Sequence, residues 1–406
     1  MTDHKHIVII GGGFGGVHAA RSLVASGAHK HSTITLISNK SYFEYYPGLY
    51  RVVTGASPIE VCIPLEEMLP KEISIAVDTV VSFDTDHKKI ITEGAGTFSY
   101  DICILAVGSE TAYYGIPGIA DLAYGFRSVA EAVKLKNHLV SLFEEHMHPS
   151  VPEQVSHFHV VIVGGGATGV EVAGDISLFM EELSKRHKID TSFITIDLIH
   201  ASNRLVPQLP PKASEKIEQR LRSLGINIYL NRTLLREELE TVYMKGMSLE
   251  SKTVVWTAGT QPHRLLKLLT KATFSPKGKI VVDDYLQAVG VDGMYVIGDA
   301  VERPESGLAQ GALQHGAYVG KHIGALLDEK ILRPFVPQKT AFAIPVGGSW
   351  GIFTMGSFVF SGRIAYMVRH LIDFMYFKDV VSVQKLFSLF FEGFKYRNDR
   401  YEKTQS

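Results

Sequence analysis

Cysteine, net charge and long apolar runs are all scarce in this chain of 406 residues. Its only cysteines, Cys62 and Cys103, are far apart and form no Cys-x-x-Cys spacing, which excludes a dithiol redox pair, a zinc site and a disulfide framework. The formal net charge of −1 provides no basic field for nucleic acid. No uninterrupted apolar stretch reaches about 18 residues, so we expect no membrane-spanning segment. The first predicted strand begins at residue 6 and leaves no room for a signal peptide, so we expect a cytoplasmic location. We also expect no metal site.

Glycine is abundant at the start of the chain, in the stretch HIVIIGGGFGGVHAARSL at residues 6–23. Ile7 to Ile10 read as a buried strand and residues 17–23 as a helix, and Gly11, Gly13 and Gly16 between them have the G-x-G-x-x-G spacing. The three glycines permit a tight turn, close approach to a pyrophosphate and close helix–strand packing. One such match is weak, because glycine turns after strands are common.

A second copy strengthens the interpretation. Residues 159–183 read HVVIVGGGATGVEVAGDISLFMEEL, with a strand at His159–Val163, Gly164, Gly166 and Gly169 at the same spacing, and then a long helix. The copies lie about 150 residues apart, near the usual domain spacing. We therefore predict an α/β chain with two Rossmann-like dinucleotide-binding domains; the alternative is two glycine turns in one doubly wound sheet.

The strand that follows each glycine loop lacks the acidic residue that usually binds the ribose hydroxyls. Thr33–Ile37 is followed by Ser38, and Phe193–Ile199 is followed by His200. Arg204 comes soon after, and a neutral and basic segment would tolerate the 2′-phosphate of NADPH. The alternative is an exposed loop without a ribose contact.

The C-terminal segment changes composition towards apolar, aromatic and basic residues. Two amphipathic helices are predicted, with apolar stripes made of Ile364, Met367, Val368, Leu371 and Met375, and of Val383, Leu386, Phe387, Phe390 and Phe394. Residues 363–403 contain eight Lys and Arg against five Asp and Glu, a local balance of +3 that suits an anionic membrane surface. A helical hairpin packed on the protein's own core or on a dimer partner is the alternative.

With these stretches, the chain resembles the two-dinucleotide-binding-domain flavoproteins, and among them the type II NADH:quinone oxidoreductases. The more specific segments are YFEYYPGLYRVVTGASPIEVCIPLEEML, GVEVAGDI, VIGDA, AQGALQHG and the ending GRIAYMVRHLIDFMYF. The resemblance implies an FAD-binding domain at 1–112 and 262–335, an NAD(P)H-binding domain at 113–261, and a C-terminal membrane-association or dimerisation region at 336–406.

The resemblance also implies which residues form the sites. FAD is expected at Gly11, Gly13, Gly16, Ser38, Pro47, Val80, Ala106, Gly108, Gly298, Asp299, Ala309 and Gln310. NADH or NADPH is expected at Gly164, Gly166, Gly169, Glu171, His200, Arg204 and Gly259. The catalytic candidates are Glu171 beside the nicotinamide and flavin, Gln310 and Gln314 beside the quinone, and His315 as a proton source. A helix-dipole role for Glu171, a surface position for the glutamines and an N-cap role for Asp299 are the structural alternatives.

The implied function is that of a peripheral, monotopic flavoenzyme, expected as a homodimer on the cytoplasmic face of a membrane. It would oxidise NAD(P)H and reduce a membrane quinone through FAD without pumping protons. The alternatives are a soluble NAD(P)H-dependent reductase of a protein carrier, which would not need the amphipathic tail, and a redox-sensing flavoprotein with little turnover. Sulfide:quinone oxidoreductases share the fold but need redox cysteines that this chain lacks.

Overall fold

Two parallel sheets form the framework of the computed structural model, which describes residues 4–94, 96–146, 155–387 and 389. The first sheet has the order β20-β9-β1-β2-β5. Its strands are β1 (Lys5–Ile10), β2 (Ser32–Ser38), β5 (Ile73–Val77), β9 (Ile102–Leu105) and β20 (Met294–Val296). Because β20 comes from much later in the chain, this sheet is built from two separate segments.

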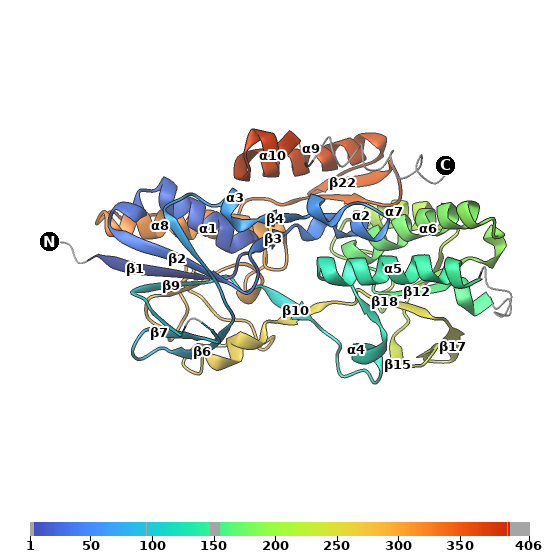
Figure 1. Cartoon of the computed structure of the whole chain (residues 1–406), viewed down its shortest axis with the longest axis horizontal. Helices are drawn as coiled ribbons and strands as arrows, with labels where there is room; N and C mark the ends of the chain where they lie inside the picture. The colour runs from blue at the N-terminus through green and yellow to red at the C-terminus, as the bar shows by residue number, and fades with distance from the viewer. Residues whose placement is uncertain (1–3, 95, 147–154, 388, 390–406) are drawn as a thin grey trace.

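The second sheet has the order β11-β18-β12-β13-β14. Its strands are β11 (Tyr124–Gly125), β12 (His159–Val163), β13 (Thr195–Ile199), β14 (Asn227–Tyr229) and β18 (Thr253–Trp256). The two sheets lie at opposite ends of the molecule in Figure 1. The prediction of two Rossmann-like units is confirmed.

Helices cover these sheets, and the chain passes twice between them. The first unit packs α1 (Phe14–Ala25) against α8 (Ala309–Leu327), and the second packs α5 (Val129–His146) against α6 (Ala167–His187) and α6 against α7 (Pro211–Ser223). The crossings pair as a short antiparallel ladder of β10 (Ser109–Thr111) and β19 (Thr260–Pro262). Figure 1 shows β10 running between the two units. Two antiparallel sheets are appended, one to each unit: β6 (Val80–Asp84), β7 (Lys89–Thr92) and β8 (Thr97–Ser99), and β15 (Leu234–Glu238), β16 (Thr241–Met244) and β17 (Met247–Glu250).

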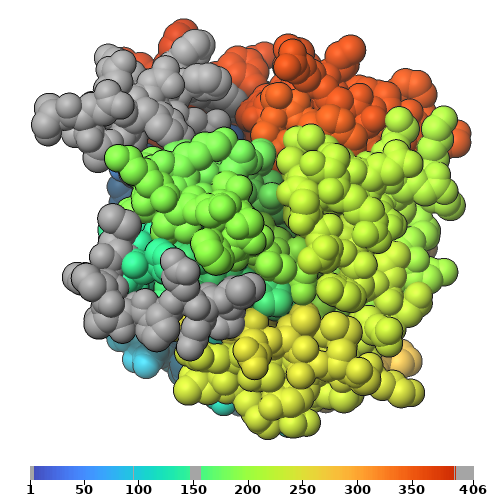
Figure 2. Space-filling model, turned by 90° about the vertical axis from the view of Figure 1, so that its right-hand side faces the viewer, coloured from blue at the N-terminus to red at the C-terminus, as the bar shows by residue number. Residues whose placement is uncertain are grey.

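The C-terminal region contains an antiparallel sheet that the sequence patterns did not predict. It consists of β21 (Ala341–Pro345), β22 (Gly351–Met355) and β23 (Phe358–Gly362), and α9 (Arg363–Val380) follows. Arg220 on α7 donates to the carbonyl oxygens of Val346 and Gly347 at 3.2 and 2.9 Å, which fixes this sheet to the second unit. In Figure 2 the C-terminal segment, in orange, lies along the upper edge beside the second unit, in green and yellow.

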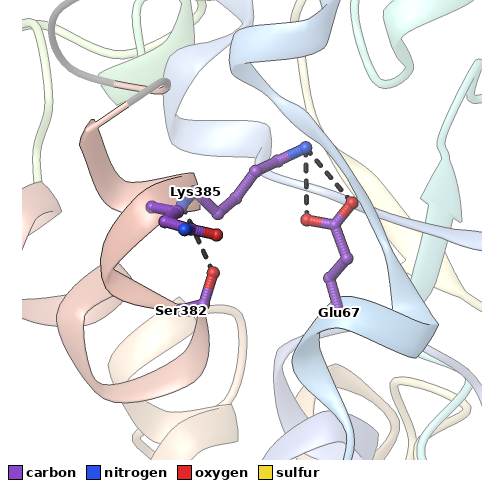
Figure 3. A pocket seen from close by; sticks show the side chains of 4 residues that line it. Glu67, Ser382 and Lys385 are labelled. Atoms are coloured by element: carbon purple, nitrogen blue, oxygen red, sulfur yellow. Dashed lines mark hydrogen bonds and ion pairs between the residues drawn. The ribbon is translucent and has the colours of Figure 1, made fainter.

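The last described helix, α10 (Val383–Phe387), is attached to the first unit instead. Lys385 forms an ion pair of 3.2 Å with Glu67 on α3 (Leu65–Met68), beside a surface pocket of about 510 Å³ that Ser382 also lines (Figure 3). The C-terminal region therefore bridges both units. Phe390 and Phe394 of the second predicted helix lie outside the described residues.

Candidate functional site

The two glycine loops have the same strained geometry. Gly11 and Gly164, at the ends of β1 and β12, have φ angles of +110° and +117° that side chains with a Cβ rarely adopt. A Cβ at Gly16 would lie 1.9 Å from the carbonyl oxygen of Gly11, and one at Gly169 would lie 1.7 Å from that of Gly164. Both loops thus need glycine for the turn and for close packing of helix on strand.

The middle glycine of each loop faces open space. Gly13 and Gly166 precede α1 and α6 in extended conformation, no side chain caps either helix, and a Cβ at either position would meet nothing within 4 Å. The first N–H groups of each helix are therefore accessible to an anion. This geometry fits a pyrophosphate at both loops.

A cavity of about 920 Å³ extends from the first loop to the second unit and is bounded on one side by the C-terminal region. Eleven of the predicted site residues line it: Gly11, Gly13, Ser38, Pro47, Ala106, Gly108, Glu171, Gly298, Asp299, Ala309 and Gln310. The others do not line it: Gly16, Val80, Gly164, Gly166, Gly169, His200, Arg204, Gly259, Gln314 and His315. Val80 is instead buried in the core beneath the first sheet.

Asp299 anchors a polar network at the junction of the two units. It lies in the short turn after β20, and its carboxylate accepts a hydrogen bond from the Ser109 hydroxyl at 2.6 Å and one from the Gly307 N–H at 3.1 Å. It does not cap α8, so the N-cap alternative is wrong. Arg127 donates to the same Ser109 hydroxyl at 2.6 Å and lies 3.7 Å from Asp299. Arg127 lines the cavity but was not predicted, because a lone arginine before a helix is too common to indicate a site.

The carboxyl end of β2 carries a serine, and the nearby acid, Glu44, is paired with a lysine. Ser38 is buried and accepts a hydrogen bond from the Lys40 N–H at 3.3 Å. Lys40 pairs at 2.6 Å with the buried carboxylate of Glu44, which also accepts the N–H of Val129 on α5 at 3.2 Å. A neutral hydroxyl and a lysine thus occupy the place where an acid was expected.

Glu171 is the most perturbed acid of the cavity. It lies one turn into α6, and burial raises its pKa to about 8, although the Arg369 guanidinium opposes the shift. Its carboxyl is therefore mostly protonated at neutral pH and can give a proton to a group in the cavity. The helix-dipole alternative would have stabilised the ionised form instead.

Arg369 reaches the cavity from α9 and holds three elements together. Its guanidinium donates to the carbonyl oxygen of Pro47 at 2.8 Å and to that of Ala343 at 3.2 Å, and it pairs at 3.1 Å with Asp373. Asp373 is 1 % exposed and also accepts a hydrogen bond of 2.5 Å from the Tyr45 hydroxyl. Sequence patterns did not identify Arg369, Asp373 or Tyr45, because two of the hydrogen bonds, Tyr45 to Asp373 and Arg369 to Pro47, join residues more than 300 positions apart.

The two glutamines bind the backbone of the segment that leads to β21. Gln310 donates to the carbonyl of Ala341 at 3.0 Å and accepts its N–H at 3.2 Å, and Gln314 accepts the N–H of Gln338 at 2.8 Å. Only Gln310 lines the cavity. Both glutamines therefore hold the backbone of this segment in place, and their contact with a quinone stays a prediction.

His315 is fully buried and supports the turn that presents Asp299. Its Nδ1 accepts the N–H of Gly298 at 3.1 Å, and its Nε2 lies 2.9 Å from Glu305, which also pairs with Arg303 at 2.8 Å. Burial lowers the pKa of the imidazole despite Glu305. His315 thus supports the turn without lining the cavity, and its role as a proton source stays a prediction.

The remaining predicted nucleotide contacts lie around the second loop. His200 accepts the N–H of Gly165 at 3.0 Å, whereas Arg204 donates to Ser214 at 3.0 Å and to the carbonyls of Pro207 and Leu209. Gly259 has a φ of +139°, and a Cβ there would collide with Tyr114. Gly259 thus has a conformational role, and Arg204 is occupied by its own loop.

Neither cysteine is placed for dithiol chemistry. Both are free; burial raises the pKa of the half-buried Cys62 to about 11, and Cys103 is fully enclosed in β9, where burial raises its pKa further. In the part of the chain that the structure describes, no cluster of three or more His, Cys, Asp or Glu side chains is arranged to hold a metal ion.

Comparisons with known proteins agree with this geometry. Type II NADH:quinone oxidoreductases from Mycobacterium tuberculosis (Ndh) and Staphylococcus saprophyticus are 29% and 24% identical, over 93% and 91% of this chain and 86% and 94% of theirs. The structure of NDH2 from Plasmodium falciparum in complex with NADH matches with a TM-score of 0.86 at 18% identity, covering 97% of this chain and 98% of that one. A sulfide:quinone oxidoreductase from Aquifex aeolicus shares the fold with a TM-score of 0.77 at 17% identity, over 95% of each chain. The profile described as pyridine nucleotide-disulphide oxidoreductase matches residues 5–316, so the chain belongs to that family.

Proposed function

We propose that this protein is an FAD-dependent NAD(P)H:quinone oxidoreductase that transfers electrons without pumping protons. The observation that carries the proposal is the single cavity in which the first glycine loop, Glu171 of the second unit and Arg369 of the C-terminal helix meet. The type II NADH:quinone oxidoreductases among its relatives span nearly its whole length, which favours this function over a carrier-protein reductase or a redox sensor.

The residues present fit FAD. The loop at Gly11–Gly16 is open for a pyrophosphate, Asp299 offers a carboxylate to a ribityl chain, and Arg127 supplies a cation between the two units. The predicted FAD residues that line the cavity are proposed to contact the group directly, with Gly16 and Val80 supporting them. When bound, FAD supplies a group that accepts a hydride and returns electrons singly or in pairs.

The residues of the second unit are proposed to hold the nicotinamide nucleotide. Gly164, Gly166 and Gly169 form its pyrophosphate loop, and Glu171 at the start of α6 faces the shared cavity. Glu171 holds a proton at neutral pH and gives it to a quinone oxygen as charge develops there, while Arg369 stays fixed beside it. Gln310 and Gln314 shape the wall towards β21, and His315 holds the turn at Asp299.

The outer face of α9 supports a membrane location. Ile364, Met367, Leu371 and Met375 are 55–68 % exposed, whereas the charged Asp373 is buried, so the apolar stripe points away from the protein's own core. We propose that this stripe, together with the exposed Val383 and Phe387, rests on the cytoplasmic face of a membrane. No helix among the described residues is long and apolar enough to span a bilayer.

Domain boundaries and oligomeric state form part of the same proposal. We assign residues 1–112 and 262–335 to FAD, 113–261 to NAD(P)H, and 336–406 to membrane association and dimerisation. The β10–β19 ladder coincides with the two domain crossings. A homodimer would bring two apolar faces to one membrane surface, which strengthens attachment without new contacts.

Steady-state turnover tests the proposal. Purified protein reconstituted with FAD should oxidise NADH rapidly with a quinone in lipid vesicles. It should do so only slowly with a small iron–sulfur carrier protein. Faster turnover with the carrier would favour the reductase alternative, and turnover with neither acceptor despite FAD binding would favour the sensor.

A further inference from the structure

The strands β13 and β14 end side by side in a continuous hydrogen-bonded edge. The N–H of His200 donates to the carbonyl of Tyr229 at 2.9 Å, and the N–H of Arg232 donates to the carbonyl of His200 at 3.0 Å. The N–H of Asn231 likewise donates to the carbonyl of Ser202 at 3.0 Å. Arg232 is therefore held against the residue at which the ribose of a dinucleotide is normally recognised.

The imidazole of His200 connects this edge to the glycine loop. Its Nδ1 accepts the N–H of Gly165 at 3.0 Å, so the neutral ring carries its hydrogen on Nε2. Nε2 is buried and has no hydrogen-bond partner among the described residues. Burial also lowers the imidazole pKa, which keeps the ring neutral. The neutral imidazole of His200 thus occupies the position at which an acidic side chain would repel a phosphate.

The charge at this edge is positive. Residues 200–206 and 229–233 contain no acidic side chain and two arginines, Arg204 and Arg232. Arg204 is used by the carbonyls of Pro207 and Leu209. Arg232 is exposed and forms no ion pair with any residue that the structure describes.

We propose that the β13–β14 edge binds the 2′-phosphate of NADPH, and that Arg232, rather than Arg204, is the side chain that pairs with it. The proposal rests on the proposed function, because it takes the second glycine loop as the nucleotide pyrophosphate site. It adds that NADPH is a substrate and names the residue that selects it.

Binding of two adenine nucleotides to the oxidised FAD-loaded protein tests this by calorimetry, without turnover. The probes are adenosine 2′,5′-diphosphate and adenosine 5′-monophosphate, which differ only in the 2′-phosphate. Arg232→Gln should weaken the diphosphate by about tenfold or more and leave the monophosphate unchanged, since a charge-assisted hydrogen bond to phosphate is lost. Arg236→Gln is the matched control, because Arg236 is also exposed but pairs with Glu238 at 2.8 Å.

His200→Glu should likewise weaken the diphosphate more than the monophosphate. The proposal is overturned if Arg232→Gln leaves diphosphate binding unchanged, weakens both probes equally, or acts no more strongly than Arg236→Gln. It is also overturned if the wild-type protein binds the monophosphate but not the diphosphate, a result that leaves the proposed function intact. Failure of both probes to bind would instead count against the nucleotide site itself.

Discussion

In the second glycine loop, the packing of α6 on β12 and the space for a nucleotide depend on different glycines and can be tested separately. Gly169→Ala places a Cβ 1.7 Å from the carbonyl oxygen of Gly164, whereas Gly166→Ala places one in open space. Real Cβ contacts stay beyond about 3.0 Å, so α6 and β12 must separate by more than 1 Å in the first variant and need not move in the second. Overpacking of this kind costs about 1–3 kcal/mol. At 2–4 °C per kcal/mol for a unit of roughly 150 residues, the melting temperature should fall by about 2–12 °C.

Both variants should lose affinity for NADH. The methyl group added in Gly166→Ala fills the space that a pyrophosphate needs, and the one added in Gly169→Ala displaces the loop. Thermal unfolding and NADH titration of the FAD-loaded proteins measure the two effects. The expected pattern is a lower melting temperature for Gly169→Ala alone, weaker NADH binding for both, and full FAD content in both, because the first loop is untouched. Unchanged NADH binding by Gly166→Ala would refute the placement of the nucleotide at this loop.

Three further predictions concern the cavity and the outer helix. The rate of quinone reduction by the wild-type protein should fall above pH 8, and Glu171→Gln should remove this fall. Because the pKa of Glu171 is raised in the folded state, the stability of the wild-type protein should also decline relative to this variant as the pH rises from about 4.5 through 8. Parallel pH profiles of wild type and variant would refute the assignment. Asp373→Asn should lower the free energy of unfolding, measured with denaturant, by about 3–5 kcal/mol, because it leaves Arg369 buried without its charge partner. Lys385→Gln, which breaks the surface ion pair with Glu67, should lower it by less than about 1 kcal/mol. Replacing Ile364, Met367 and Leu371 with Ser should weaken vesicle binding by roughly a hundredfold or more at unchanged melting temperature, and a large loss of stability would show that this face is covered within the folded protein.

The glycine loops could be predicted from sequence because their constraints are local. Strand, turn and helix lie within about 18 consecutive residues, and the steric need for glycine at Gly16 and Gly169 arises from the same loop. The strand at His159–Val163 was predicted with its observed bounds.

The C-terminal region was harder to predict, because periodicity reveals an apolar stripe but not which face is buried. On α9 the stripe is exposed except for the half-buried Val368, and Arg369 and Asp373 face inward, where residues from distant segments contact them. Deleting residues 363–406 would therefore remove part of the cavity as well as the apolar face. Point substitutions on the exposed stripe are the cleaner test of membrane binding.

An anaerobic titration can follow the electrons from NADH through the flavin to a quinone. NADH is added stepwise to the yellow protein, the flavin absorbance is followed, and a membrane quinone is then added without oxygen. We expect complete bleaching at about one NADH per flavin and recovery of the absorbance by about one equivalent of quinone, because each step transfers two electrons. Absorbance that does not respond to NADH, or that NADH bleaches and quinone fails to restore, would contradict it.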